Sequence, residues 1–175
     1  MRSIKSWKAY VIILTMAGLI FLLASLSSPD SRITASQRLP ALSYLSKAGL
    51  KQLRFSDDYY ILVVLISDKC GVCVDQLNSY DRDFYVHPQL NIVFLTTDLK
   101  FLIDHRADDW ANLSRHRQIV FGIVKRDDFR KAFGTLITPS YYLFDRKGLR
   151  IWAAMGKVSF TKINKLVPSG NSIKN

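Results

Sequence analysis

The sequence predicts an α/β domain with a mixed sheet flanked by helices, preceded by an N-terminal transmembrane helix. From residue 59 onwards, apolar segments typical of buried strands alternate with segments of helical spacing. The last two strands are joined by a short turn with glycine, so the sheet has antiparallel as well as parallel neighbours. A long uncharged run near the N-terminus has the length of a membrane span.

Residues 9–27 carry no charge and are rich in Ile, Leu, Val and Phe. As a helix, this run would extend about 28 Å, close to the thickness of a bilayer core. Three basic residues among the first eight favour a cytoplasmic N-terminus. A cleaved signal peptide is the alternative, but its apolar region is usually about 7–15 residues long. We therefore favour an uncleaved anchor in residues 1–28, and both interpretations place the rest outside the cytoplasmic membrane.

The remaining chain is predicted to form a linker over 29–39, one domain over 40–168 and a flexible tail over 169–175. A domain of this length can bury one core. The expected helices are 39–53, one that begins at Cys70 and ends before His87, 99–113, 127–133 and 159–167. The expected strands are 61–66, 91–97, 119–124, 141–144 and 149–153.

Composition excludes several classes of function. The chain has 25 Lys and Arg against 14 Asp and Glu, but the basic residues are scattered and form no nucleic-acid motif. A basic surface near a membrane is the simpler interpretation. Only two cysteines are present, too few for a disulfide scaffold, and the three histidines have no metal-ligand spacing relative to them. We predict no metal and no cofactor.

The chemistry-bearing motif is Cys70-Gly-Val-Cys73, directly after the most apolar strand. Cys70 falls where strand gives way to helix, and the free N–H groups at a helix N-terminus favour the nucleophilic thiolate. Cys73 lies one turn further and can close a disulfide with Cys70. Two buried inert cysteines are the alternative, against which Gly71 favours a tight, open turn. The motif therefore predicts a dithiol redox site.

Together with a second motif, this pair resembles the thioredoxin superfamily over about residues 59–167. The second motif, Phe133 to Gly148, is similar to the family's helix, cis-proline loop and hairpin, with Pro139 at the proline. Pro139 lies 66 residues after Cys73, further than in plain thioredoxins. The excess matches an extra helix and strand at about 99–124. With an N-terminal anchor, this resembles the TlpA/ResA-like thiol-disulfide oxidoreductases.

The resemblance implies a membrane-anchored enzyme that reduces or exchanges disulfides of extracytoplasmic partner proteins. Cys70 would attack and Cys73 resolve, while the backbone of Thr138 beside Pro139 would bind the partner. A trans proline starting a strand is the alternative for Pro139. Lys69 would favour the thiolate, or would be an ordinary solvated cation.

The implied setting is a bacterial inner membrane, crossed once, with the domain in the periplasm or otherwise outside the cytoplasmic membrane. The implied partners are thiol or disulfide proteins and a redox partner that recycles the dithiol, with no nucleic acid. The competing hypothesis is a non-enzymatic binding or metal-carrying module of a membrane complex.

Three positions depart from the family pattern. Lys69 stands where thioredoxins usually have Trp, and Val64 where they have a buried Asp. Gln76 stands where TlpA-like members often have Glu. Because these acids help to move the proton of the second cysteine, we expect a different proton route here.

Overall fold

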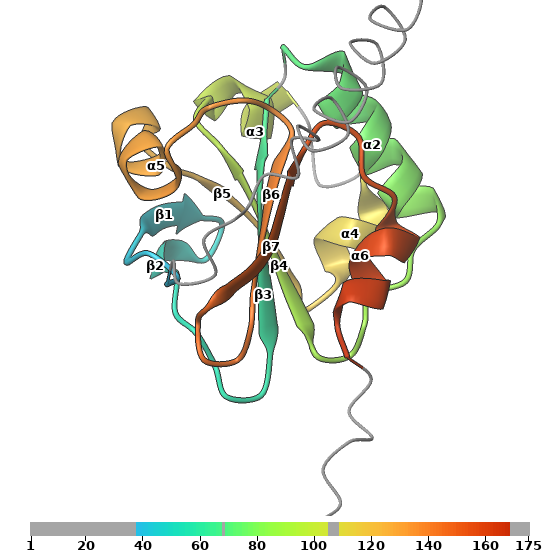
Figure 1. The fold of residues 1–175 in the computed structure, drawn as a ribbon. Coiled ribbons are helices and arrows are strands. Elements are labelled where there is room, and N and C mark those ends of the chain that lie inside the picture. Colours follow the sequence, from blue (N-terminus) through green and yellow to red (C-terminus); the bar gives the residue numbers. More distant parts are fainter. Residues whose placement is uncertain (1–37, 68, 105–108, 169–175) are drawn as a thin grey trace, which may run out of the picture. The chain divides into compact units, whose positions relative to one another are not determined.

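The computed structural model describes residues 38–67, 69–104 and 109–168, which form a seven-stranded mixed sheet with helices on both faces (Figure 1). The predicted span at residues 9–27 lies outside this part of the chain. Within the described ranges, no helix has the length and apolarity needed to cross a bilayer. The strands are β1 Ser43–Ser46, β2 Gly49–Gln52, β3 Tyr60–Ile66, β4 Leu90–Thr96, β5 Ile119–Ile123, β6 Ser140–Phe144 and β7 Arg150–Met155. The helices are α2 Gly71–Arg82, α3 Leu99–Asp104, α4 Ala111–Arg115, α5 Arg126–Phe133 and α6 Phe160–Leu166.

The strand order is β2-β1-β5-β4-β3-β6-β7. The central strands β3, β4 and β5 are parallel, with Val64 paired to Phe94 and Phe94 to Phe121. The flanking strands β6, β7, β1 and β2 are antiparallel to their neighbours. This confirms the mixed sheet, and it places the end of β3, where the cysteine motif begins, near the middle of the sheet.

Two apolar layers cover the faces of the sheet, because alternate residues of each strand point to opposite sides. On one face, Leu62 and Val64 of β3 pack with Leu77 of α2 and with residues of α3, α4 and α6. On the other, Leu65 of β3 packs with Phe129 of α5 and with the β1 region. Figure 1 shows α2, α4 and α6 on one side of the sheet and α5 on the other. Both faces of β3 are therefore buried, as its unbroken apolar run predicts.

The predicted helix over residues 39–53 is wrong: the segment forms the β1–β2 hairpin. Leu42 and Tyr44 are buried, whereas Ser43 and Leu45, which alternate with them, are exposed, and this is the two-residue period of a strand. Gly49 has φ 94°, a left-handed conformation that a regular helix does not contain. Ahead of the hairpin, the Leu39 N–H donates to Gly148 O at 2.7 Å, so the folded unit already includes Leu39.

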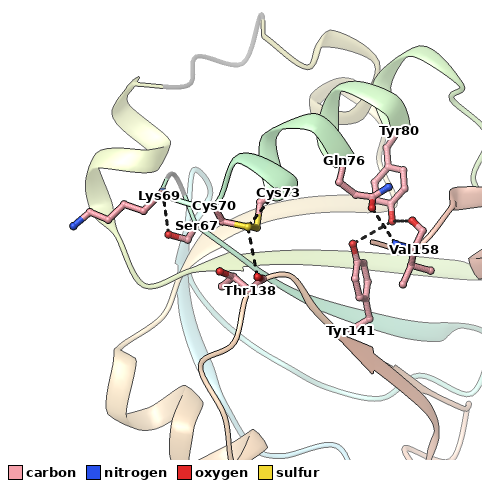
Figure 2. The surroundings of a disulfide bond; sticks show 9 residues. All are labelled: Ser67, Lys69, Cys70, Cys73, Gln76, Tyr80, Thr138, Tyr141 and Val158. Carbon is pink, nitrogen blue, oxygen red and sulfur yellow. Dashed lines mark hydrogen bonds between the residues drawn. A yellow bond between two sulfur atoms is a disulfide. The ribbon is translucent and has the colours of Figure 1, made fainter. Parts of the chain in front are cut away.

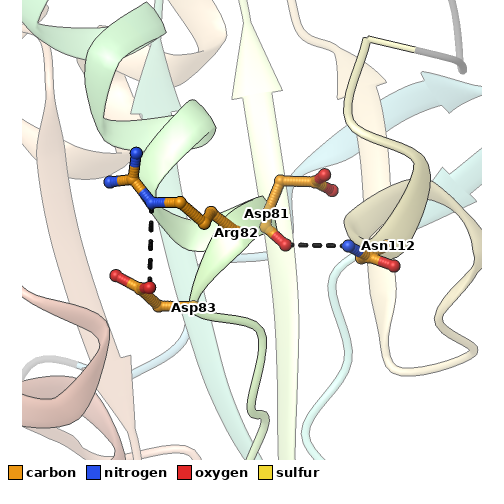
Figure 3. A network of polar contacts seen from close by, with 4 residues as sticks. All are labelled: Asp81, Arg82, Asp83 and Asn112. Carbon is orange, nitrogen blue, oxygen red and sulfur yellow. Dashed lines mark hydrogen bonds and ion pairs between the residues drawn. The ribbon is translucent and has the colours of Figure 1, made fainter.

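The predicted single helix over 99–113 is also wrong, because α3 and α4 are separate and residues 109–110 form a turn. The short helix α4 is held by α2. The Asp81 carboxylate accepts the Leu113 N–H at 2.9 Å, and the Asp81 carbonyl accepts from Asn112 Nδ2 at 2.9 Å (Figure 3). The N-cap of α4, Trp110, makes no side-chain capping bond. Asp81 thus caps α4 from a different helix.

The other predicted elements are present within a few residues. Helix α5 ends at Gly134, whose φ of 78° gives the left-handed conformation expected at a helix C-terminus. The β6–β7 turn places Gly148 at φ 74°. Helix α6 begins after Ser159, whose hydroxyl accepts the Lys162 N–H. Trp110, Tyr141 and Tyr142 are buried in the core.

Candidate functional site

The cysteine pair lies at the junction of β3 and α2, where Cys70 and Cys73 form a disulfide with their Cα atoms 5.2 Å apart (Figure 2). Cys70 is the N-cap residue of α2, with extended backbone. Its sulfur accepts the Cys73 N–H at an N–S distance of 3.2 Å. In the reduced protein, the same N–H group and the helix dipole would favour a thiolate on Cys70.

The two sulfur-bearing residues differ in exposure. Cys73 is 0% exposed and belongs to the core layer beneath α2, whereas Cys70 is only partly buried at its edge. Attack on a bulky protein substrate requires access to the sulfur atom. Cys70 is therefore the more accessible residue of the pair.

The proline loop lies beside the disulfide. The Thr138–Pro139 peptide bond is cis, as the resemblance implies, and Pro139 is buried. The carbonyl oxygen of Thr138 is 3.5 Å from the Cys70 sulfur, and Figure 2 shows it directly facing the disulfide. Residues separated by 68 positions are thus brought together at one end of the sheet.

Two exposed apolar residues are neighbours in sequence of the residues that form this site. Val72 lies between the cysteines, and Ile137 precedes Thr138 in the loop; both are about half exposed. Sequence reasoning did not select either residue, because a single exposed aliphatic side chain is unremarkable, and only the fold brings the two segments that carry them together at Cys70 and Thr138.

Lys69 is exposed, and Figure 2 shows its side chain extending away from the two sulfur atoms. Its backbone N–H donates to the Ser67 hydroxyl at 3.3 Å. A screened cation that points away has a small influence on a thiolate. The helix N-terminus is therefore the stronger electrostatic effect at Cys70.

The positions of the expected buried acids hold neutral residues with clear structural partners. Val64 is buried in the layer beneath α2. Gln76 is 3% exposed, and its Oε1 accepts the Val158 N–H at 3.0 Å, which ties α2 to the segment before α6. The amide satisfies a buried donor, a role that sequence reasoning missed because Val158 is distant in the chain.

Two buried tyrosines continue this polar group along α2. The Tyr80 hydroxyl donates to Val158 O at 2.5 Å and lies 3.3 Å from the Tyr141 hydroxyl. Burial raises the pKa of Tyr80 far above its usual range, and burial also raises the pKa of Tyr141 to about 12. Both phenols therefore stay protonated at neutral pH.

Among the described residues, no group of three or more His, Cys, Asp or Glu side chains is placed to hold a metal ion. Reduction of the disulfide would make two thiolates available as soft ligands.

No protein-family model matches the chain, and comparison with curated protein sequences finds no match. Solved structures do match. A peroxiredoxin-like protein from Aquifex aeolicus superposes with a TM-score of 0.60 at 11% identity, covering 75% of this chain and 84% of that one. StoA from Bacillus subtilis gives 0.56 at 10% identity, covering 74% and 97%. The thioredoxin domain of a thiol-disulfide oxidoreductase from Bacteroides vulgatus gives 0.52 at 17% identity, covering 77% and 98%.

The chain therefore has a thioredoxin-like fold, a mixed α/β sheet flanked by helices. It carries a disulfide-forming Cys-x-x-Cys pair at positions 70–73, where β3 meets α2. At these identities the likeness concerns the fold, and activity has to be argued from the site itself.

Proposed function

We propose that the protein is a membrane-anchored thiol-disulfide oxidoreductase that reduces or exchanges disulfides of extracytoplasmic partner proteins. The observation that carries the proposal is the asymmetric disulfide at the start of α2, with Cys70 partly exposed and Cys73 fully buried. A disulfide that served only to stabilise the fold would gain nothing from an accessible sulfur beside an open loop.

The reaction proceeds through a mixed disulfide. In the reducing direction, the Cys70 thiolate attacks one sulfur of the partner's disulfide and displaces the other as a thiolate. Cys73, after losing its proton, attacks the Cys70 sulfur, re-forms the Cys70–Cys73 disulfide and releases the second partner sulfur. The partner gains two electrons and two protons, which the dithiol loses. A second thiol-disulfide protein recycles the dithiol, and the reverse sequence oxidises a partner.

Thr138 and Pro139 would position the partner. The Thr138 carbonyl faces the Cys70 sulfur at 3.5 Å, so an extended peptide that pairs with this backbone would carry its own sulfur close to Cys70. Val72 and Ile137 would contact apolar side chains of that peptide. Lys69 would contribute only weakly to the thiolate, since its side chain extends away from it.

A non-enzymatic binding or metal-carrying module is the second candidate. The observation in its favour is the neutral character of Val64 and Gln76: among the residues that the structure describes, no Asp or Glu is buried that could accept the proton of Cys73. Two thiolates could then hold a soft metal ion such as Cu(I).

Insulin reduction separates the two candidates. The purified protein with excess dithiol should accelerate precipitation of the insulin chains, and Cys70→Ser should abolish the acceleration because it removes the attacking sulfur. No acceleration by the wild type, together with tight binding of one Cu(I) per reduced protein, would support the binding module instead.

A further inference from the structure

The β1–β2 hairpin presents an outer face that the redox chemistry does not use. Strand alternation places Ser43 and Leu45 of β1 on the same side as Leu50 and Gln52 of β2, opposite to the buried Tyr44. Leu45 and Leu50 are direct cross-strand partners, yet they are 51% and 75% exposed. A paired, exposed leucine couple is unusual on a solvated surface and indicates a contact with something apolar.

Basic residues surround these leucines. Lys47 lies in the hairpin turn and Arg54 just after β2, and both are exposed. Lys51 is paired with Tyr44, so it leaves the edge strand β2 on the other side, but it is exposed and lines a hollow that Leu50 and Gln52 also line. Residues 38–56 contain four basic residues and no acidic one; the first acids in the chain beyond them are Asp57 and Asp58. The combination of exposed leucines and uncompensated cations fits an interface that is both apolar and anionic.

The hairpin also carries a polar cleft. A hollow of about 420 Å³ is lined by Ser43, Leu50, Lys51, Gln52 and Arg54. The Gln52 side-chain oxygen lies 3.5 Å from Arg54 Nη2 and orients the guanidinium. Hydroxyl, amide, ammonium and guanidinium donors next to a leucine are suited to a phosphate that is attached to an acyl chain.

We propose that this face, defined by Leu45, Lys47, Leu50 and Arg54 with Lys51 at its edge, docks onto the anionic headgroups of a phospholipid bilayer. The predicted span ends at residue 27, and the described chain begins at Arg38, so the intervening residues reach at most about 40 Å. Arg38 is bridged to Leu149, and the hairpin starts five residues later. The hairpin is thus the first element of the fold after the predicted anchor.

A second copy of the chain and a nucleic acid fit this face less well than a bilayer does. Among the described strands, β2 pairs only with β1, so a second copy could in principle add to its open edge. That pairing would bring the cations of both copies together, which is unfavourable without counter-charge. Nucleic acid would match the charge but would leave the two leucines without partners, because bases stack on aromatic side chains.

Hydrogen exchange of the full chain reconstituted in vesicles tests the proposal independently of thiol chemistry. Peptides covering residues 43–55 should exchange more slowly in phosphatidylglycerol–phosphatidylcholine vesicles than in phosphatidylcholine alone. The triple variant Lys47→Gln, Lys51→Gln, Arg54→Gln should lose this protection. Each basic residue at an anionic surface changes the docking equilibrium constant roughly five-fold. The ratio of docked to undocked protein should therefore fall by about a hundred-fold in the triple variant. High salt should also remove the protection.

The matched control, Lys157→Gln, Lys162→Gln, Lys165→Gln, makes the same charge change around α6 and should keep the protection. Equal exchange in the two kinds of vesicle would overturn the proposal, as would equal loss in both triple variants. It would also be overturned if glycerol phosphate, an oligonucleotide or raised protein concentration in phosphatidylcholine gave the same protection. These outcomes identify a free phosphate site, nucleic acid or self-association.

Discussion

Tyr141 shows how a single buried residue sets a pH limit on this fold. Its hydroxyl and that of Tyr80 are 3.3 Å apart in the core beneath α2, and burial raises the pKa of Tyr141 to about 12. An unfolded chain ionises tyrosine near pH 10. The contribution of the protonated phenol to stability is therefore complete below pH 10 and is lost as the pH rises towards 12.

We predict that the free energy of unfolding falls steeply above pH 10, with Tyr141 contributing up to about 1.4 kcal/mol per pH unit. Tyr141→Phe should make the fall shallower, while the exposed Tyr85→Phe should not change it. Denaturant unfolding between pH 9 and pH 12 measures both. Identical slopes for wild type and Tyr141→Phe would contradict the assigned role.

Lys69 gives a second prediction at this scale. Because its side chain extends away from the disulfide, Lys69→Gln should change the alkylation rate of reduced Cys70 at neutral pH by less than about two-fold. Iodoacetamide labelling followed over time measures this rate. A ten-fold decrease would show instead that the ammonium stabilises the thiolate.

Helix α4 illustrates how neighbouring elements complete one another. It has only five residues, too few to be stable alone, and its N-terminal N–H group at Leu113 is satisfied by Asp81 of α2. The carboxylate of Asp83, two residues further along, lies 3.8 Å from the Arg82 Nε atom, and the two side chains are 68% and 76% exposed.

We predict that Asp81→Ala lowers the free energy of unfolding by about 0.5–2 kcal/mol, since it removes the cap of α4. Asp83→Ala, the matched control two residues further along, should lower the free energy of unfolding by about 0–1 kcal/mol. Asp81→Asn, which keeps an acceptor oxygen, should recover most of the loss. Equal effects of the two alanine variants in denaturant unfolding would argue against the capping role.

The helices and strands that could be predicted from sequence are those whose residue pattern is compatible with only one kind of secondary structure. The unbroken apolar run of β3 and the glycine that ends α5 are examples. The hairpin at 43–52 was mistaken for a helix because Leu42, Leu45 and Leu53 match helical spacing, while only the fold shows that Leu45 is exposed. Contacts such as Gln76 with Val158 lie 82 positions apart and could not be inferred from local pattern.

The whole molecule adds a prediction about topology. Basic residues before the uncharged run 9–27 favour an N-terminus inside and the folded domain outside. A reporter that is active only in the periplasm, fused after Asn175, should therefore be active in bacteria. The domain should also be digested by external protease in spheroplasts. An inactive reporter on a protected domain would overturn the proposed location.

Cys70 and Cys73 have different roles in the proposed reaction: Cys70 attacks the partner and Cys73 resolves the mixed disulfide. Trapping this mixed disulfide tests the two roles most directly. Cys73→Ser keeps the attacking sulfur and removes the resolving one. It should therefore accumulate covalent adducts with partner proteins, and a reductant should cleave these adducts. Cys70→Ser, which leaves only the buried sulfur, should accumulate none. Non-reducing gels of membrane fractions show the adducts, and mass spectrometry identifies the partner. Adducts on Cys70→Ser alone would contradict the assigned roles. If neither variant forms adducts and the wild type fails to exchange with a small disulfide, the proposed oxidoreductase function is contradicted.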